Sequence, residues 1–317
     1  MSASGPWEFR PLRRSDFRSY RDVVVLGIGR LERSTGTAES AMAGIDLLER
    51  RSIRFVLGFL RWIGRPYVDV LVAANASGVA GTGTVLWLPK TAYVAGMATR
   101  PEYRGQGIAS RILALQGDLA RRRRRPWLAL DVESDNEPAV RVYQKAGYRE
   151  LGRFAWFTRT GSPALTPGDP PGIRPVGRSD WRPLTARLDA SRPPEYRAAF
   201  PARPPLLHHN EILVRGGRVE NETWWKETSS DGLAVLRAYF LPGTRMGALF
   251  PLSTDSEPSS EEFTGLFGAA AEWLRARDPR RCLAAAPEGQ RGVSAALEAL
   301  GFSAVVSSKL MVRSAAV

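Results

Sequence analysis

A short glycine loop, Arg104-Gly105-Gln106-Gly107-Ile108-Ala109, has the residue types and spacing of an anion-binding site. An apolar run from Tyr93 to Thr99 precedes it, and apolar residues recur at helical spacing after it, so the order is strand, tight loop, helix. Glycines at 105 and 107 let the backbone turn sharply, which leaves the amides of residues 106–110 free to point at one anion at the helix N-terminus. The loop therefore predicts a phosphate-sized site.

A second run, Asn136-Glu137-Pro138-Ala139-Val140-Arg141-Val142-Tyr143-Gln144-Lys145-Ala146-Gly147-Tyr148, follows a strand-like stretch at residues 126–133. This run predicts a helix, because Asn136 suits an N-cap and Pro138 is tolerated in the first turn. Gly147 suits the C′ position that ends such a helix. The whole segment therefore alternates strand, helix, strand, helix.

These two runs resemble the two signatures of the GCN5-related N-acetyltransferase (GNAT) superfamily. The spacing Arg-x-x-Gly-x-Ala is similar to the family's pyrophosphate loop, and the run from Asn136 to Tyr148 matches Asn-x-x-Ala-x-x-apolar-Tyr-x-Lys-x-Gly-aromatic at every position. The resemblance implies an α/β fold whose mixed, mostly antiparallel central sheet is flanked by helices. It also implies an acyltransferase that moves an acetyl group from acetyl-CoA, as cosubstrate, to a primary amine of an unidentified acceptor by direct transfer.

The resemblance further implies which residues hold acetyl-CoA. The pantetheine arm would follow the strand before the loop, Asn136 would be both a helix cap and a pantetheine ligand, and Tyr143 would stand near the sulfur as general acid. A cap role alone for Asn136, and a purely structural role for Tyr143 packed under the last strand, remain open. The implied cofactor-binding residues are Met97, Ala98, Thr99, Arg104, Gly105, Gln106, Gly107, Ile108, Ala109, Ser110, Asn136 and Tyr143.

Several groups could serve as the general base. Many relatives carry a glutamate on the strand before the glycine loop, but here Val94-Ala95-Gly96-Met97 has no carboxylate. Asp131 and Glu133 lie two apart on the next strand and so share a face. Glu133, nearer the C-terminal end of that strand, is the candidate base, with a salt bridge to a nearby arginine as the alternative role. In some tandem acetyltransferases the C-terminal carboxylate serves, so Val317 and an ordered water also remain open.

The length and composition of the chain indicate an ordinary globular protein and exclude several other classes of protein. The chain has 317 residues, 44% of them hydrophobic and 24% charged, which predicts two ordinary globular domains. Cys282 is the only cysteine, which excludes a disulfide framework and a cysteine-based metal site. The only histidines, His208 and His209, are adjacent and unsuited to the usual zinc site, so we expect no metal. Without a signal peptide or an apolar run of spanning length, a cytoplasmic protein with no membrane span is expected.

The net charge of +13 raises the question of a nucleic-acid or ribosome partner. Only four of the 45 basic residues are lysines, and the arginines are spread over both halves of the chain, which indicates a compositional bias. The one cluster, Arg121 to Arg125, ends the helix that begins at Gly107, where cations complement the helix dipole. A solvated helix end is therefore favoured over a nucleic-acid patch, and contact with nucleic acid or the ribosome is kept as an alternative.

The chain contains an internal repeat. Phe9-Arg10-Pro11-Leu12-Arg13-Arg14-Ser15-Asp16-Phe17 is echoed by Ile173-Arg174-Pro175-Val176-Gly177-Arg178-Ser179-Asp180-Trp181, and residues 139–148 are echoed by residues 293–302. The Pro- and Gly-rich stretch between the copies is typical of a linker. We therefore predict two tandem GNAT-type domains. Their ranges are a catalytic acetyl-CoA-binding domain at 1–160, a linker at 161–172 and a degenerate GNAT-like domain at 173–317.

The second copy lacks the residues of the predicted CoA site. Its long helix begins in Pro258-Ser259-Ser260-Glu261-Glu262, which has no glycine loop and whose glutamates would repel a pyrophosphate. Aligning Gly147 with Gly301 places Leu297 opposite Tyr143, so the phenol is missing as well. The second domain is expected to bind no CoA and to shape the acceptor cleft or hold the first domain rigid.

Some alternatives stay open at this level. The apolar stretch at residues 53–63 could be core packing, a hydrophobic acceptor channel or a membrane contact. Two other function classes also remain, namely a non-catalytic acyl-CoA-binding regulatory protein and a protein- or ribosome-directed N-acetyltransferase that uses the basic surface.

Overall fold

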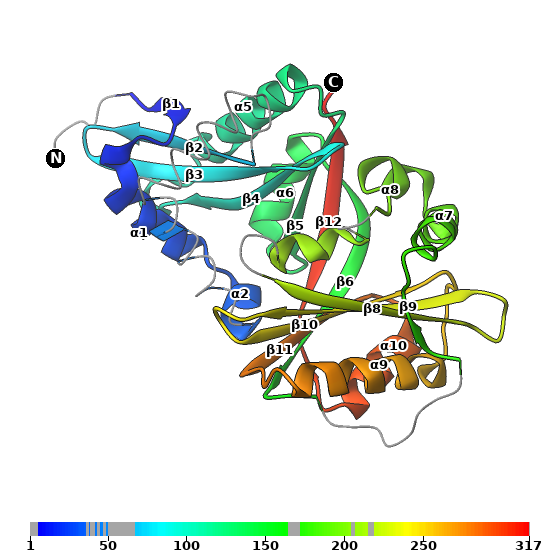
Figure 1. Ribbon diagram of the computed structural model, residues 1–317. Helices are drawn as coiled ribbons and strands as arrows, with labels where there is room; N and C mark the ends of the chain where they lie inside the picture. Colours follow the sequence, from blue (N-terminus) through cyan, green and yellow to red (C-terminus); the bar gives the residue numbers. More distant parts are fainter. Residues whose placement is uncertain are drawn as a thin grey trace. The chain divides into compact units, whose positions relative to one another are not determined.

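The structure is a computed structural model that describes residues 6–35, 38, 42, 45–46, 49, 67–163, 172–203, 207–214 and 219–316. The apolar stretch at 53–63, residues 164–171 of the predicted linker and Val317 lie outside these described residues. Contacts between residues divide the chain into two units (Figure 1). Unit 1 holds Met1–Arg33, Ala38–Leu151 and Lys309–Val317, and unit 2 holds Ser34–Thr37 and Gly152–Ser308.

The sheet of unit 1 is mostly antiparallel. Its strand order is β1-β2-β3-β4-β5-β12, and each described pair from β1 to β4 is antiparallel while β4 and β5 are parallel. The strands are β1 (Glu8–Pro11), β2 (Val68–Asn75), β3 (Gly78–Trp87), β4 (Thr91–Thr99), β5 (Trp127–Glu133) and the end of β12 (Ser303–Ser314). The helices are η1 (Arg14–Asp16), α1 (Phe17–Gly27), α2 (Arg30–Thr35), η2 (Pro101–Tyr103), α5 (Ile108–Arg122) and α6 (Glu137–Lys145).

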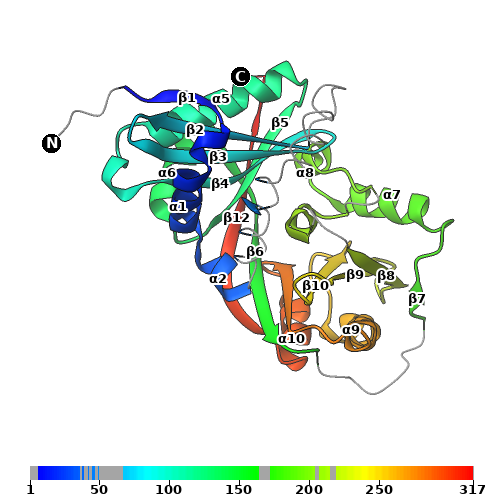
Figure 2. The same ribbon diagram turned by 60° about the vertical axis from the view of Figure 1, so that its left-hand side comes forward.

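Helices α1 and α5 cover opposite faces of this sheet (Figure 2), and the burial of the β2 side chains shows how each face is used. Its side chains alternate between the two faces, as a strand requires. Val70 and Val72 are buried in one cluster with residues of α1, whereas Leu71 is buried in another with Ile108 and Ile112 of α5. The sheet of unit 1 is therefore the middle layer of three.

Strands β4 and β5 lie side by side over only part of their length. Their pairing runs from Thr91↔Trp127 to Tyr93↔Ala129, although β4 continues to Thr99 and β5 to Glu133. Their C-terminal ends are thus not paired with each other among the described residues. Both the glycine loop and the start of α6 follow from these ends, so the divergence places the two sequence motifs around one opening.

Unit 2 repeats this plan. Strands β7 to β10 pair antiparallel in sequence order, β10 and β11 are parallel, and β11 pairs antiparallel with β6. Both units therefore carry a mixed, mostly antiparallel sheet flanked by helices, which confirms the predicted fold class. The strands are most of β6 (Arg149–Thr160), the first part of β12, β7 (Arg174–Pro175), β8 (Glu220–Glu227), β9 (Leu233–Leu241), β10 (Met246–Ser253) and β11 (Arg281–Pro287). The helices are α7 (Trp181–Ser191), α8 (Pro194–Ala199), η3 (His209–Val214), α9 (Ser260–Arg275) and α10 (Arg291–Ala299).

The units do not coincide with the ranges expected from the repeat. Residues 152–160 of β6, expected in the first domain, group with unit 2, where Phe154 to Thr160 pair with Pro287 to Arg281 of β11. Residues 309–317, expected in the second domain, group with unit 1, where Met311 and Ala315 are buried in one cluster with Leu128. The end of the first sequence copy thus belongs to unit 2, and the end of the second sequence copy belongs to unit 1.

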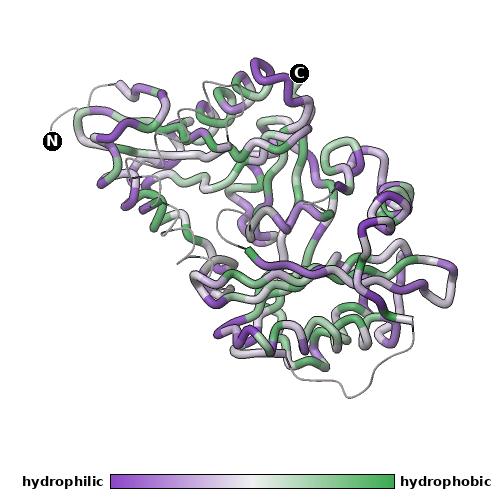
Figure 3. The backbone as a smooth tube through the Cα atoms, in the orientation of Figure 1, coloured by the Kyte–Doolittle hydropathy of each residue, from purple (hydrophilic) through white to green (hydrophobic). Residues whose placement is uncertain are grey.

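The arginine cluster that ends α5 is only partly solvated. Arg123 Nη2 donates to Asp69 Oδ2 at 2.9 Å, and Trp87 Nε1 donates to the same oxygen at 2.8 Å. The guanidinium also lies 4.7 Å from the centroid of the Trp87 ring. The prediction of a solvated helix end is therefore wrong for Arg123. Its neighbours Arg121, Arg122 and Arg124 are exposed. The tube is coloured hydrophilic at this end of α5 in Figure 3.

Replacing this buried carboxylate should destabilise unit 1. The Asp69 side chain is only 8% exposed, so Asp69→Asn would leave Arg123 with a neutral partner in a site of low polarity. We expect a loss of about 1–3 kcal/mol in the free energy of unfolding, measured by urea denaturation. The matched control is Asp118→Asn, which breaks an ion pair with Arg121 on the surface of α5. Equal effects of the two substitutions would contradict the prediction.

Candidate active site

A cavity of about 720 Å³ lies within unit 1 where β4 and β5 diverge. It is lined by the connection between α1 and α2, the end of β4, the glycine loop, the end of β5 and one face of α6. Its residues are Leu26, Gly27, Ile28, Gly29, Arg30, Arg33, Met97, Ala98, Thr99, Tyr103, Arg104, Gly105, Gly107, Ile108, Ala109, Ser110, Glu133, Asn136, Pro138, Ala139, Val142, Tyr143 and Lys145. The structure therefore brings both sequence motifs and Glu133 to one place.

The glycine loop leaves the N-terminus of α5 open. Gly105 has φ +78° and Gly107 has φ +76°, in the left-handed region that favours glycine. Gly107 is the N-cap of α5, and no side chain caps this helix. A Cβ atom added at Gly105 or Gly107 would meet nothing within 4 Å. The first-turn amides and the positive end of the helix dipole are therefore available to an anion in the cavity.

Neighbouring side chains hold this loop in place. The Nε atom of Arg104 donates to the carbonyl oxygen of Thr99 at 3.3 Å, which ties the loop back to the end of β4. Ile108 is buried against β2 and β3, so the first turn of α5 is anchored on its inner side. Gln106 is exposed and does not line the cavity, in contrast to Gly105 and Gly107 on either side of it.

The second motif forms the opposite wall. Asn136 is the N-cap of α6, and its Oδ1 accepts from the backbone amide of Ala139 at 3.3 Å, which confirms the predicted cap. Asn136 and Ala139 line the cavity together with Val142 and Tyr143, since residues three and four apart share one face of a helix. Pro138 stands in the first turn and Gly147 has φ +85°, as the sequence predicted.

Tyr143 is a buried phenol at the wall of the cavity. Its side chain packs in one cluster with Leu130 and Val140 and is 8% exposed. Burial raises the pKa of Tyr143 well above its usual value, because desolvation disfavours the phenolate. The hydroxyl is therefore protonated throughout the physiological pH range and can act as a proton donor.

Glu133 lies on the other side of β5 from Tyr143. Leu130 and Val132 pack with Tyr143 in one cluster, and Glu133 alternates to the opposite face. Its side chain is 17% exposed, and its Oε2 lies 3.5 Å from Nε of Arg30, which also pairs with Asp135. The salt bridge considered for Glu133 is thus present, and it holds the carboxylate at the cavity.

The other carboxylate of β5 is used differently. Asp131 accepts a hydrogen bond from the hydroxyl of Tyr93 and does not line the cavity. Of the two candidate carboxylates, Glu133 is the one that the structure places at the site.

The α1–α2 connection contains cavity residues that the motifs do not include. The last two residues of α1, Leu26 and Gly27, line the cavity. So do Ile28 and Gly29, which connect the helices, and Arg30, the first residue of α2. The signal in the sequence is the Gly-x-Gly spacing between two helical stretches, which marks a break in a helix.

The corresponding position in unit 2 is closed. Ser259 caps α9 in a reciprocal capping box with Glu262, so the chain's own side chains accept from the amides of both residues and place the Glu262 carboxylate at this helix start. A Cβ atom at Gly292, in the first turn of α10, would lie 2.0 Å from the carbonyl oxygen of Pro258. The starts of α9 and α10 are therefore in direct contact, whereas those of α5 and α6 border a cavity.

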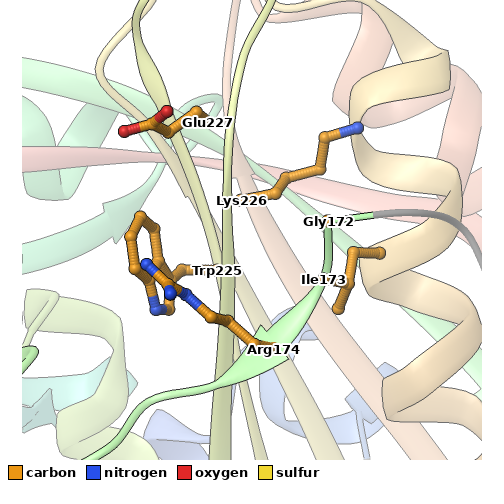
Figure 4. Close-up of a pocket in the computed structure, with 6 residues that line it drawn as sticks. All are labelled: Gly172, Ile173, Arg174, Trp225, Lys226 and Glu227. Atoms are coloured by element: carbon orange, nitrogen blue, oxygen red, sulfur yellow. The ribbon is translucent and has the colours of Figure 1, made fainter.

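Unit 2 has a different cavity of about 500 Å³ at the edge strand β7 (Figure 4). The Arg174 guanidinium stacks over the Trp225 ring at 4.1 Å, and Lys226 and Glu227 extend away from each other. The remaining lining residues are Gly172 and Ile173. This cavity lacks a helix N-terminus, and its aromatic surface is already covered by Arg174.

Two other kinds of chemistry find no support in the described part of the chain. Within it, no three His, Cys, Asp or Glu residues are placed so that they could hold a metal ion. Burial raises the pKa of the Cys282 thiol to about 12, so this cysteine is not an activated nucleophile. Among the described helices, none is long and apolar enough to cross a membrane.

The chain is similar in sequence to known acetyltransferases. A model of the acetyltransferase (GNAT) family matches residues 43–148. A Bacillus subtilis (strain 168) protein, whose name proposes it as a ribosomal protein bS18-alanine N-acetyltransferase, is 30% identical over 101 residues, which span 32% of this chain and 67% of that protein. N-alpha-acetyltransferase 30 of Schizosaccharomyces pombe (strain 972 / ATCC 24843) is 33% identical over 73 residues, which span 23% of this chain and 49% of that protein.

One similar solved structure is that of a tandem GNAT protein from the clavulanic acid biosynthesis pathway, without AcCoA. It is 18% identical with a TM-score of 0.54, and the match covers 98% of both chains. This likeness extends over both units, whereas the sequence matches are confined to about a third of the chain or less. It concerns the fold alone.

Proposed function

Because the chain belongs to the GNAT family of acetyltransferases, we propose that unit 1 binds acetyl-CoA and transfers its acetyl group directly to a primary amine. One observation carries the proposal: the uncapped N-terminus of α5 and the protonated phenol of Tyr143 border the same cavity. The first feature suits a pyrophosphate, and the second suits a leaving thiolate. Unit 2, whose equivalent helix is capped by its own side chains, takes no CoA in this proposal.

The proposed reaction needs few groups. The amine nitrogen attacks the thioester carbon and forms the C–N bond, and the tetrahedral intermediate then breaks the C–S bond. The amine gives up one proton and the thiolate takes one, so the products are an amide and the CoA thiol. Tyr143 donates to the sulfur from one side of β5. Glu133 accepts the proton of the amine from the other side, directly or through a water.

The names of similar proteins indicate which acceptor to test first. One relative is named for an alanine of a ribosomal protein and the other is named an N-alpha-acetyltransferase. These names favour the amino terminus of a polypeptide as the acceptor to test first. Small-molecule amines and lysine side chains are the competing acceptor classes, and a non-catalytic acyl-CoA-binding protein is the competing function.

Two measurements on the full chain test this function. Titration calorimetry with acetyl-CoA should give one site per chain, since the start of α9 is closed. A thiol-release assay should then show transfer to at least one of three acceptor panels: peptides with free amino termini, lysine side chains with blocked termini, and small amines. Mass spectrometry locates the added acetyl group. Binding without transfer to any panel would favour the non-catalytic alternative, and two sites per chain would contradict the role given to unit 2.

A further inference from the structure

Arg313, in the last strand, joins the two helices that border the acetyl-CoA cavity. It belongs to residues 309–317, which group with unit 1. Its Nη1 donates to the carbonyl oxygen of Ala146 at 3.1 Å, and its Nη2 donates to that of Leu113 at 3.3 Å. Ala146 is the C-cap residue of α6, and Leu113 lies within α5. One planar group therefore spans both helices.

Helix α5 makes room for this guanidinium with a glycine. A Cβ atom at Gly117 would lie 2.4 Å from Nη2 of Arg313. Glycine in a helix interior costs about 1 kcal/mol relative to alanine, so its presence in the middle of α5 calls for a reason. The close approach of Arg313 supplies one. The bond to Leu113 is possible because the residue one turn later has no side chain.

Arg313 also acts on the end of α6 that carries Tyr143. The backbone amides of Ala146 and Tyr148 both donate to the carbonyl oxygen of Tyr143 at 3.0 Å, so Arg313 binds the turn that fixes this residue. A cation at the C-terminus of α6 is favourable because that end of the helix dipole is negative. The guanidinium carbon lies 5.1 Å from the centroid of the Tyr148 ring, which in turn contacts the Tyr143 ring edge-on.

We propose that Arg313 is a positioning residue for acetyl transfer: it fixes α6 against α5, so that the Tyr143 hydroxyl meets the sulfur of a CoA held at the start of α5. This inference rests on the proposed function of unit 1. Arginine suits the task because its rigid fork can donate to two carbonyl oxygens at once, whereas lysine presents a point charge. Arg313, which is distant in sequence from both motifs, would thus contribute to catalysis in unit 1 without touching the substrate.

Three variants of the full chain test the proposal. Arg313→Lys and Gly117→Ala should each lower kcat by about 10- to 100-fold, the scale expected when a catalytic group is displaced by about 1 Å. The dissociation constant of acetyl-CoA should change less, because the glycine loop itself is untouched. Gly117→Ala is the sharper test, since alanine displaces the guanidinium while its better helix propensity should keep the melting temperature from falling. The matched control is Lys309→Met. It also removes a cation from β12, but this cation pairs with Glu150 and not with the carbonyl oxygens of α5 and α6.

A second readout does not depend on turnover. A fluorotyrosine placed at position 143 should give a fluorine NMR resonance that shifts in Arg313→Lys and Gly117→Ala and stays in place in Lys309→Met. If the wild type transfers no acetyl group, the proposed function fails, yet the resonance still reports whether Arg313 positions the ring. The inference is overturned if Gly117→Ala keeps wild-type kcat and an unshifted resonance. It is equally overturned if kcat falls only in parallel with melting temperature and CoA affinity, which is the behaviour of a structural residue.

Discussion

A glutamate at position 107 should abolish acetyl-CoA binding. In Gly107→Glu a carboxylate would stand at the N-cap of α5, in the open space where the pyrophosphate is proposed to lie. Like charges placed together cost several kcal/mol, which corresponds to a loss of more than about 100-fold in affinity. Titration calorimetry of the purified variant measures this directly. The melting temperature without ligand reports whether unit 1 still folds.

The control for this prediction separates charge from backbone strain. Gly107 has φ +76°, so any side chain at this position is strained, and Gly107→Ala carries that strain without the charge. It should weaken binding far less than the glutamate does, since a Cβ atom here meets nothing within 4 Å. Undiminished binding by Gly107→Glu would show that the pyrophosphate lies elsewhere. Equal losses in the two variants would assign the effect to the backbone.

Removing one oxygen from Tyr143 should remove most of the activity. Tyr143→Phe keeps the ring in its apolar cluster with Leu130 and Val140 and deletes only the proton donor. Loss of a general acid typically lowers the rate by about 10²- to 10⁴-fold, and we expect kcat to fall within that range. Acetyl-CoA affinity and melting temperature should barely change, because burial already disfavours a charged form of this residue.

A buried tyrosine away from the cavity provides the comparison. Tyr20 is 3% exposed, lies on α1 in a different core cluster, and does not line the cavity. Tyr20→Phe should therefore retain wild-type turnover even if it lowers stability. If Tyr143→Phe stays within a factor of about three of the wild type, Tyr143 is a structural residue and another group protonates the thiolate.

Local features of the site could be predicted from the sequence because short-range physics determines them. The glycines at 105 and 107 were expected to turn the chain before a helix, and both adopt positive φ at the start of α5. Asn136 was expected to cap the next helix, and its side chain does so. These outcomes depend on residues within one or two turns of each other, so neighbouring types suffice to predict them.

Features that join distant parts of the chain could not be predicted in this way. Arg30 and Glu133 are far apart in sequence, so nothing local indicates their ion pair. Arg123 was expected in solvent because a cation suits the end of a helix, but a buried carboxylate on β2 binds it instead. The grouping of residues 309–317 with unit 1 was missed because alternation along a strand fits the edge of either sheet equally well.

Because residues 309–317 belong to unit 1, the order of synthesis on the ribosome affects when unit 1 can fold. A nascent chain that has emerged only as far as residue 308 contains every motif residue of unit 1 but lacks the strand beside β5. The edge of β5 is then unpaired, and the core places later filled by Met311 and Ala315 are exposed to other chains. Unit 1 is therefore completed only after residues 309–317 have been added to the chain. A stop codon after position 308 should leave a product that contains both signatures but lacks the core residues that support the proposed acetyl-CoA site.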